Sequence, residues 1–130
     1  MADENSCACE GAPILIFACS GSADVGALAD QAARQLTREG VGRMYCLAGV
    51  GGRVAPIMET TDIAGKILVI DGCPLACAQH TLEVAGFTRY VHLRLTDLGL
   101  KKGSSPVTEE TIAKVAAQGK ALLTDIRRPL

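Results

Sequence analysis

Two short, continuous apolar runs constrain the fold of this chain more than any other feature. One covers Pro13–Ala18, and the other covers Lys66–Ile70, where the residues are Lys-Ile-Leu-Val-Ile. Runs of this length without polar alternation are typical of β-strands that are buried on both faces. Such strands belong to a parallel sheet with helices on either side. The two runs therefore predict a layered α/β fold.

The segments between these runs alternate between helical and strand-like patterns. Apolar residues recur at helical spacing over 25–36, with Ser22 as a candidate cap, Asp24 in the first turn and Gly40 at the end. Met44–Ala48 is a second short apolar run and is predicted to be the second strand. Strand, helix and strand thus follow one another before the run at 66–70 begins.

The second half of the chain repeats this alternation. Cys73-Pro74 is predicted to open a helix, because proline is favoured at the first helical position. Tyr90–Leu95 alternates between apolar and polar residues, which predicts a half-exposed edge strand, and Thr108 is predicted to cap a last helix. The pattern favours one three-layer α/β domain with a mostly parallel sheet of about four strands, in the flavodoxin-like order 2-1-3-4.

Length and charge set the domain count and exclude several classes of protein. The chain has 130 residues, so residues 13–130 are expected to form one domain after a flexible N-terminal tail at residues 1–12. Hydrophobic residues make up 48% of the chain and the formal net charge is -1, which argues against disorder and against nucleic-acid binding. No apolar run approaches the roughly 20 residues of a membrane span. A soluble, cytoplasmic protein with no membrane or nucleic-acid partner is expected, and no protein partner is indicated.

The cysteines are the strongest indication of function. Six cysteines in a reducing compartment point to metal or thiol chemistry rather than to disulfides. Cys19 and Cys73 follow the first and third predicted strands. Cys46 lies late in the second strand, and Cys77 lies one helical turn after Cys73. Because the carboxyl ends of neighbouring parallel strands meet at one edge, these four thiols are expected to converge and to match the tetrahedral coordination of zinc.

The segment Asp71–Ala78, with the sequence Asp-Gly-Cys-Pro-Leu-Ala-Cys-Ala, resembles the signature of the DGC domain family. The Cys-Ser-Gly segment that begins at Cys19 and the stretch Thr96–Lys102 are also similar to that family. The family comprises small bacterial proteins that are described as zinc-binding and have four characteristic cysteines. The resemblance therefore implies that the metal ligands are Cys19, Cys46, Cys73 and Cys77.

Two other uses of these cysteines are compatible with the sequence. Cys73 at a helix N-terminus would be an activated thiolate in a redox or sulfur-transfer enzyme, with another of the four cysteines as its resolving partner. An iron–sulfur cluster on the same four thiolates is a second alternative. The sequence is compatible with these enzymatic and cluster-binding roles as well as with a metal carrier, a sensor or a structural zinc site.

Several other residues have both a functional and a structural interpretation. His80, three residues after the last of the four cysteines, is either a further ligand or, by preference, an exposed helix residue. His92 is expected to be solvated. Asp71 either supports the site through a hydrogen bond or ends its strand in a turn. Cys7 and Cys9 lie in the tail and are expected to take no part in the metal site.

Overall fold

Two neighbouring parallel strands, β1 (Ile14–Ala18) and β3 (Lys66–Asp71), form the centre of the sheet. The structure is a computed structural model, and it describes residues 11–125. Every residue of β1 has a register partner in β3, from Ile14 opposite Lys66 to Ala18 opposite Ile70. Apart from the first residue of each strand, all of their residues are buried. The prediction that the two apolar runs are strands covered on both faces is confirmed.

The sheet has the order β2-β1-β3-β4, and every neighbouring pair is parallel. β2 (Arg43–Met44) lies beside β1, and β4 (Val91–Arg94) lies beside β3. The predicted order 2-1-3-4 and the edge position of the last strand are therefore confirmed. The chain passes from β1 to β2 in one direction and returns past β1 to β3, so the switch point of the topology lies between β1 and β3.

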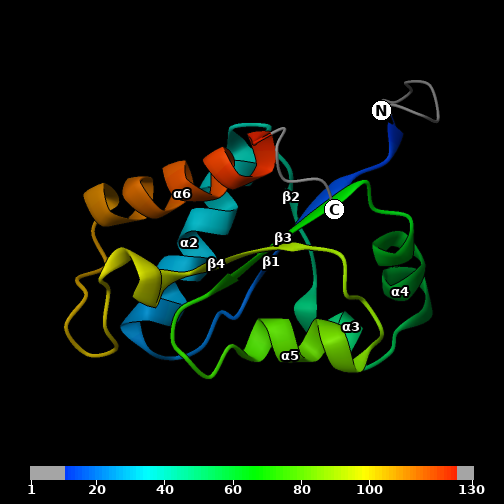
Figure 1. The fold of residues 1–130 in the computed structure, drawn as a ribbon, viewed down its shortest axis with the longest axis horizontal. Coiled ribbons are helices and arrows are strands. Elements are labelled where there is room, and N and C mark those ends of the chain that lie inside the picture. Colours follow the sequence, from blue (N-terminus) through cyan, green and yellow to red (C-terminus); the bar gives the residue numbers. More distant parts are fainter. Residues whose placement is uncertain (1–10, 126–130) are drawn as a thin grey trace.

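Helices cover both faces of this sheet (Figure 1). The remaining elements are, in chain order, α2 (Asp24–Arg38), α3 (Leu47–Gly51), α4 (Ala55–Asp62), α5 (Cys77–Val84), the 3-10 helix η1 (Leu95–Leu98) and α6 (Glu109–Thr124). α2 and α6 pack on one face, and α3, α4 and α5 lie on the other. Within residues 11–125, no helix combines the length and the apolar character that a membrane span requires.

Aliphatic side chains form a separate core on each face of the sheet. In β1, Leu15 and Phe17 face the layer of α3 and α5, whereas Ile16 and Ala18 face the layer of α2 and α6. None of these four side chains is more than 3% exposed. Burying one large aliphatic side chain stabilises a fold by about 1.5–3 kcal/mol, so hydrophobic burial is the main force that holds both helical layers to the sheet.

The prediction of a strand over Met44–Ala48 is wrong beyond its first residue. β2 ends at Met44, and α3 begins at Leu47. Cys46 is the N-cap of α3, where its Sγ accepts a hydrogen bond from the backbone N–H of Gly49 at 3.3 Å. The apolar run therefore leaves the sheet and enters a helix. A short apolar run by itself does not distinguish a buried strand from a buried helical segment.

The predicted start of the helix after β3 is also wrong. The helix begins at Cys77 rather than at Cys73-Pro74, because Ala76 adopts a left-handed conformation with φ of 51° just before it. Pro74 lies in the connecting turn. At the start of α2, the N-cap is Ala23 rather than Ser22, while Asp24 lies in the first turn as predicted.

Gly72 allows the strand end of β3 to approach α2 closely. A Cβ added at Gly72 would lie 2.7 Å from the backbone carbon and oxygen of Val25, which no side chain tolerates without a shift. We expect Gly72→Ala to lower the free energy of unfolding by about 1–3 kcal/mol, the usual effect of overpacking. Urea denaturation followed by circular dichroism measures this loss.

Gly21→Ala is the matched control for that substitution. A Cβ added at Gly21 meets nothing within 4 Å, so its effect should be close to neutral. Equal stability of the Gly72→Ala variant and the natural protein would contradict the close approach.

Candidate functional site

Three of the four predicted ligands surround one hollow at the carboxyl ends of β1 and β3. Cys19, Cys73 and Cys77 line this hollow, which has a volume of about 210 Å³. Asp71, Leu75 and Lys102 also contribute to its wall. Its position is the switch point of the sheet, where ligands of open α/β folds usually bind. Tertiary structure therefore brings together cysteines from the loops that follow two neighbouring strands.

Cys19 is tied by its backbone and by its sulfur to the end of β3. Its backbone N–H donates to the carbonyl oxygen of Ile70 at 3.1 Å. Its Sγ accepts a hydrogen bond from the backbone N–H of Gly72 at 3.4 Å. Backbone N–H groups directed at sulfur are typical of the surroundings of metal-bound cysteines, whose properties such hydrogen bonds tune. The half-buried thiol of Cys19 thus faces the loop that carries the next two cysteines.

The side chain of Asp71 anchors the loop that carries Cys73 and Cys77. Its side chain, in a residue that is 1% exposed, accepts hydrogen bonds from the backbone N–H groups of Ala78 at 2.8 Å and Gln79 at 3.1 Å. Its Oδ2 also lies 2.8 Å from Nε2 of His92 on β4. The prediction that His92 is merely solvated is therefore wrong, because the neighbouring strand places it against a buried carboxylate. Asp71 both ends its strand and fixes the start of α5.

A second set of side-chain hydrogen bonds ties the edge of the sheet to α5. The side-chain amide of Gln79 donates to the hydroxyl oxygen of Tyr90 at 2.8 Å, and that hydroxyl donates to Glu83. Burial, together with the hydrogen bond to Glu83, raises the pKa of Tyr90. The hydroxyl is therefore held in its protonated, donating form, and α5 is attached to the residue just before β4 as well as to Asp71.

The loop from Cys73 to Cys77 is a turn rather than part of a helix. The N–H of Ala76 donates to the carbonyl oxygen of Cys73 at 3.1 Å, and Ala76 itself is left-handed. Cys73 is half-buried, and Cys77 is exposed. The prediction that Cys73 and Cys77 lie one turn apart in the same helix is wrong, although both line the same hollow. The prediction that Cys73 sits at a helix N-terminus is wrong for the same reason.

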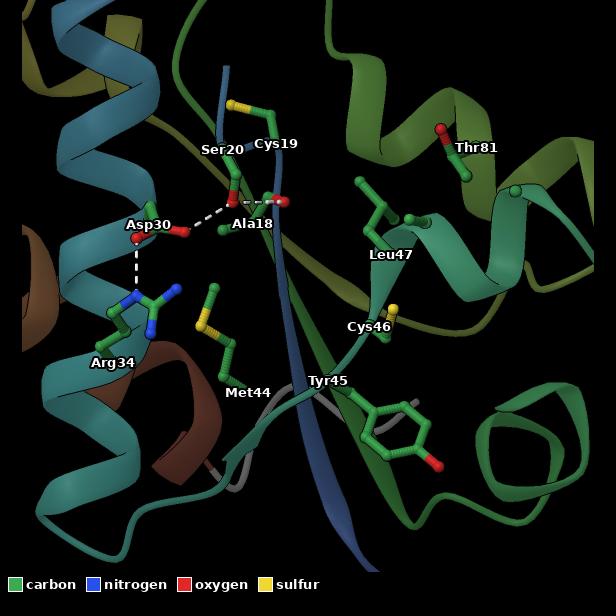
Figure 2. A pocket seen from close by; sticks show the side chains of 12 residues that line it. Ala18, Cys19, Ser20, Asp30, Arg34, Met44, Tyr45, Cys46, Leu47 and Thr81 are labelled. Atoms are coloured by element: carbon green, nitrogen blue, oxygen red, sulfur yellow. Dashed lines mark hydrogen bonds and ion pairs between the residues drawn. The ribbon is translucent and has the colours of Figure 1, made fainter. Parts of the chain in front are cut away.

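Cys46 is not among the residues that line the hollow with the other three cysteines. It is exposed and lines a different cavity, of about 660 Å³, between α2 and α3. Cys19 contributes to the walls of both this cavity and the hollow. In Figure 2 the side chains of Cys19 and Cys46 occupy separate parts of the cavity wall, and neither sulfur points toward the other. The hydrogen bond from Gly49 to Cys46 Sγ keeps this thiol at the start of α3.

The donor set suits a soft metal ion, but the thiols are not yet gathered around one point. Within residues 11–125, no three side chains of His, Cys, Asp or Glu lie close enough together to hold a metal ion. Thiolate side chains would therefore have to turn toward one another when a metal binds. His80 lines a separate shallow hollow with Arg53 and Val84. Cys7 and Cys9 lie outside the described residues.

One wall of the hollow depends on a long-range contact that the sequence did not reveal. The Asp24 carboxylate accepts hydrogen bonds from the backbone N–H groups of Gly103, at 2.9 and 3.0 Å, and Ser105, at 3.0 Å. The segment so anchored carries Lys102, which lines the hollow. The hydrogen bonds from Gly103 and then Ser105 hold the pKa of Asp24 below its usual range. An acidic residue in the first turn of a helix was the only local signal.

Comparison with known proteins gives two matches and one negative result. The model of the family described as the DGC domain matches residues 15–118. The anaerobic and virulence modulator AnvM of Pseudomonas aeruginosa is 40% identical over 88 residues, which cover 68% of this chain and 67% of that protein. No solved structure matches significantly.

The lowered pKa of Asp24 predicts how stability changes in acid. The folded state favours the carboxylate, so its stabilising effect is present above the unfolded value, about 3.9, and is lost as the pH falls through the lower folded value. We expect Asp24→Asn to lower the melting temperature at neutral pH. The difference in melting temperature between the variant and the natural protein should become smaller as the pH falls toward about 3. Thermal melts over this range measure it.

Asp62 offers a control at the end of α4, since its carboxylate makes no hydrogen bond to another described residue. Asp62→Asn should not destabilise the protein at neutral pH. A constant difference between Asp24→Asn and the natural protein at every pH would contradict the proposed role of the Asp24 carboxylate.

Proposed function

The chain belongs to the DGC domain family, and from this premise we propose that it is a metal-binding protein that holds one zinc ion through cysteine thiolates. The proposed ligands are Cys19, Cys46, Cys73 and Cys77. Zinc bound by four thiolates is tetrahedral and has no open position for water. The metal would then be carried, sensed or structural, and the site would not activate water for hydrolysis.

The observation that carries this proposal is that three cysteines line the hollow at the switch point of the sheet. These cysteines come from two loops that are distant in sequence, and the backbone N–H of Gly72 is directed at the sulfur of Cys19. Lys102 in the wall offers a positive charge that would partly offset the negative charge of a zinc–thiolate centre. The site thus combines soft ligands with groups that favour negative charge.

Cys46 is the fourth ligand in this proposal and differs from the others. Its Sγ accepts the hydrogen bond from Gly49 at the start of α3, and this bond would be exchanged for a bond to the metal. Such an exchange would link occupancy of the metal site to the short helix α3. A link of this kind suits a metal that binds reversibly better than a metal with a purely structural role.

A carried or sensed metal also agrees with the construction of the domain. Both cores consist mainly of aliphatic side chains, against which Cys19 and Cys73 pack only as partly buried neighbours. The relative AnvM is an anaerobic and virulence modulator, which supports a sensing or regulatory role for this chain. We therefore favour a metal sensor or carrier over a structural zinc site.

The redox interpretation loses the feature on which it rested. α5 begins at Cys77, and the N–H groups of Ala78 and Gln79 are engaged by Asp71 rather than left for a thiolate at Cys73. An iron–sulfur cluster would use the same thiolates as zinc. Such clusters absorb visible light whereas zinc–thiolate centres do not, so colour distinguishes the two.

Metal content tests the ligand assignment. We expect protein purified without added metal to contain about one zinc per chain, as four-cysteine sites do. Cys19→Ser, Cys73→Ser and Cys77→Ser should each reduce the zinc content several-fold when measured by elemental analysis. His80→Ala should retain zinc, because His80 does not line the hollow.

The double substitution Cys7→Ser and Cys9→Ser should likewise leave the zinc content unchanged. Loss of zinc in that variant would show that the assignment of ligands is wrong. A visible absorption band that follows the iron content would favour the cluster over zinc.

Removal of the metal with a chelator distinguishes a carried or sensed ion from one that organises the fold. We expect the far-ultraviolet circular dichroism to persist at room temperature, because the aliphatic cores remain packed. The melting temperature should fall, since a ligand that binds only the folded state stabilises it by mass action. Outright unfolding on chelation would instead indicate a structural metal, as in zinc fingers.

A further inference from the structure

The cavity between α2 and α3 has the size and position of a binding site for a small molecule. Its volume is about 660 Å³, within the range of roughly 300–1,000 Å³ that is typical of ligand sites. It opens at the carboxyl ends of β1 and β2, with α2 on one side and α3 on the other (Figure 2). Ligands of open α/β sheets bind in crevices at this end of the strands.

A polar chain along α2 forms one side of this cavity. The Nε of Arg34 donates to Asp30 Oδ2 at 2.7 Å, and the hydroxyl of Ser20 donates to Asp30 Oδ1 at 2.8 Å. Asp30 thereby contacts the guanidinium group of Arg34, a side chain that is 56% exposed, through one nitrogen only. The two terminal nitrogens of Arg34 make no hydrogen bond to any other described residue. In Figure 2 the guanidinium group lies at the cavity wall beside Met44.

The charged and apolar residues of the cavity wall together indicate which kind of small molecule the cavity would bind. Arg34 and Asp30 are the charged side chains among the described residues of the lining, and their charges cancel. Oriented guanidinium groups bind carboxylates end-on, and a carboxylate with unused lone pairs accepts an ammonium group. Met44, Leu47 and Ala48 provide an apolar surface in the same cavity. A ligand with a carboxylate, an ammonium group and an apolar side chain matches all three features.

We propose that this cavity binds an α-amino acid with an apolar side chain. The carboxylate of the ligand pairs with the terminal nitrogens of Arg34, and its ammonium group pairs with Asp30. Its side chain contacts the wall formed by Met44 and Leu47. Cys19 and Cys46 of the proposed metal site also line this cavity, but the charged groups that would pair with the ligand, Arg34 and Asp30, are not proposed metal ligands.

Three related probes test this pairing on the full chain. L-phenylalanine has both charged groups, 3-phenylpropionate lacks the ammonium group, and phenethylamine lacks the carboxylate. We expect L-phenylalanine to shift the backbone amide resonances of residues 18–20 and 44–48 saturably in a 15N-labelled sample under reducing conditions. Each of the other two compounds should bind with an affinity at least roughly tenfold lower, because each loses one charge-assisted interaction.

Substitutions in α2 complete the test. Arg34→Gln should weaken L-phenylalanine binding by roughly tenfold, and Asp30→Asn should have a similar effect. Arg38→Gln, one turn further along α2 and outside the cavity, should bind like the natural protein. Unsaturable shifts, equal binding of the three compounds, or unchanged affinity in Arg34→Gln would overturn the proposal. Zinc content measured on the same variants should stay unchanged, which separates this result from that of the metal site.

Discussion

The buried carboxylate of Asp71 connects three elements of the fold, and the geometry of the cysteine loop depends on it. A charge in a residue that is only 1% exposed is costly unless its oxygens are fully hydrogen-bonded. Here the N–H groups of Ala78 and Gln79 and the imidazole of His92 satisfy it. Since Cys73 and Cys77 lie between Asp71 and these N–H groups, the loop that carries them is anchored at both ends.

Close backbone contacts bring the other side of the hollow against that loop. Gly72 approaches the backbone of Val25 so closely that a side chain at this position would collide with it. A side chain at Gly26 would likewise meet the backbone of Gly21, 2.7 Å away. These contacts hold the loop after β1 and the loop after β3 side by side. The Asp-Gly-Cys order thus has a physical basis, since the aspartate anchors the loop, the glycine permits the contact and the cysteine enters the hollow.

Cys19 links the two candidate sites because it lies in the walls of both the hollow and the larger cavity. The residue after it, Ser20, is left-handed with φ of 51° and bonds to Asp30 in that cavity. Strained residues of this kind are concentrated at functional sites. A metal bound at the hollow and a small molecule bound in the cavity would therefore act on neighbouring residues of one loop.

Sequence alone determined the layered fold, because the runs at 14–18 and 66–70 carry enough apolar side chains to require burial on both faces. It also indicated the strand order and placed Cys19 and Cys73 beyond the ends of β1 and β3. Local patterns report local burial and hydrogen bonding, so they could not reveal contacts between distant segments. The Asp71 carboxylate anchors the start of α5 and pairs with His92. The Asp24 carboxylate anchors Gly103. Tertiary structure decided these features. It also decided that three cysteines line the hollow and that Cys46 does not, because each of these features depends on groups that meet only after the sheet has formed.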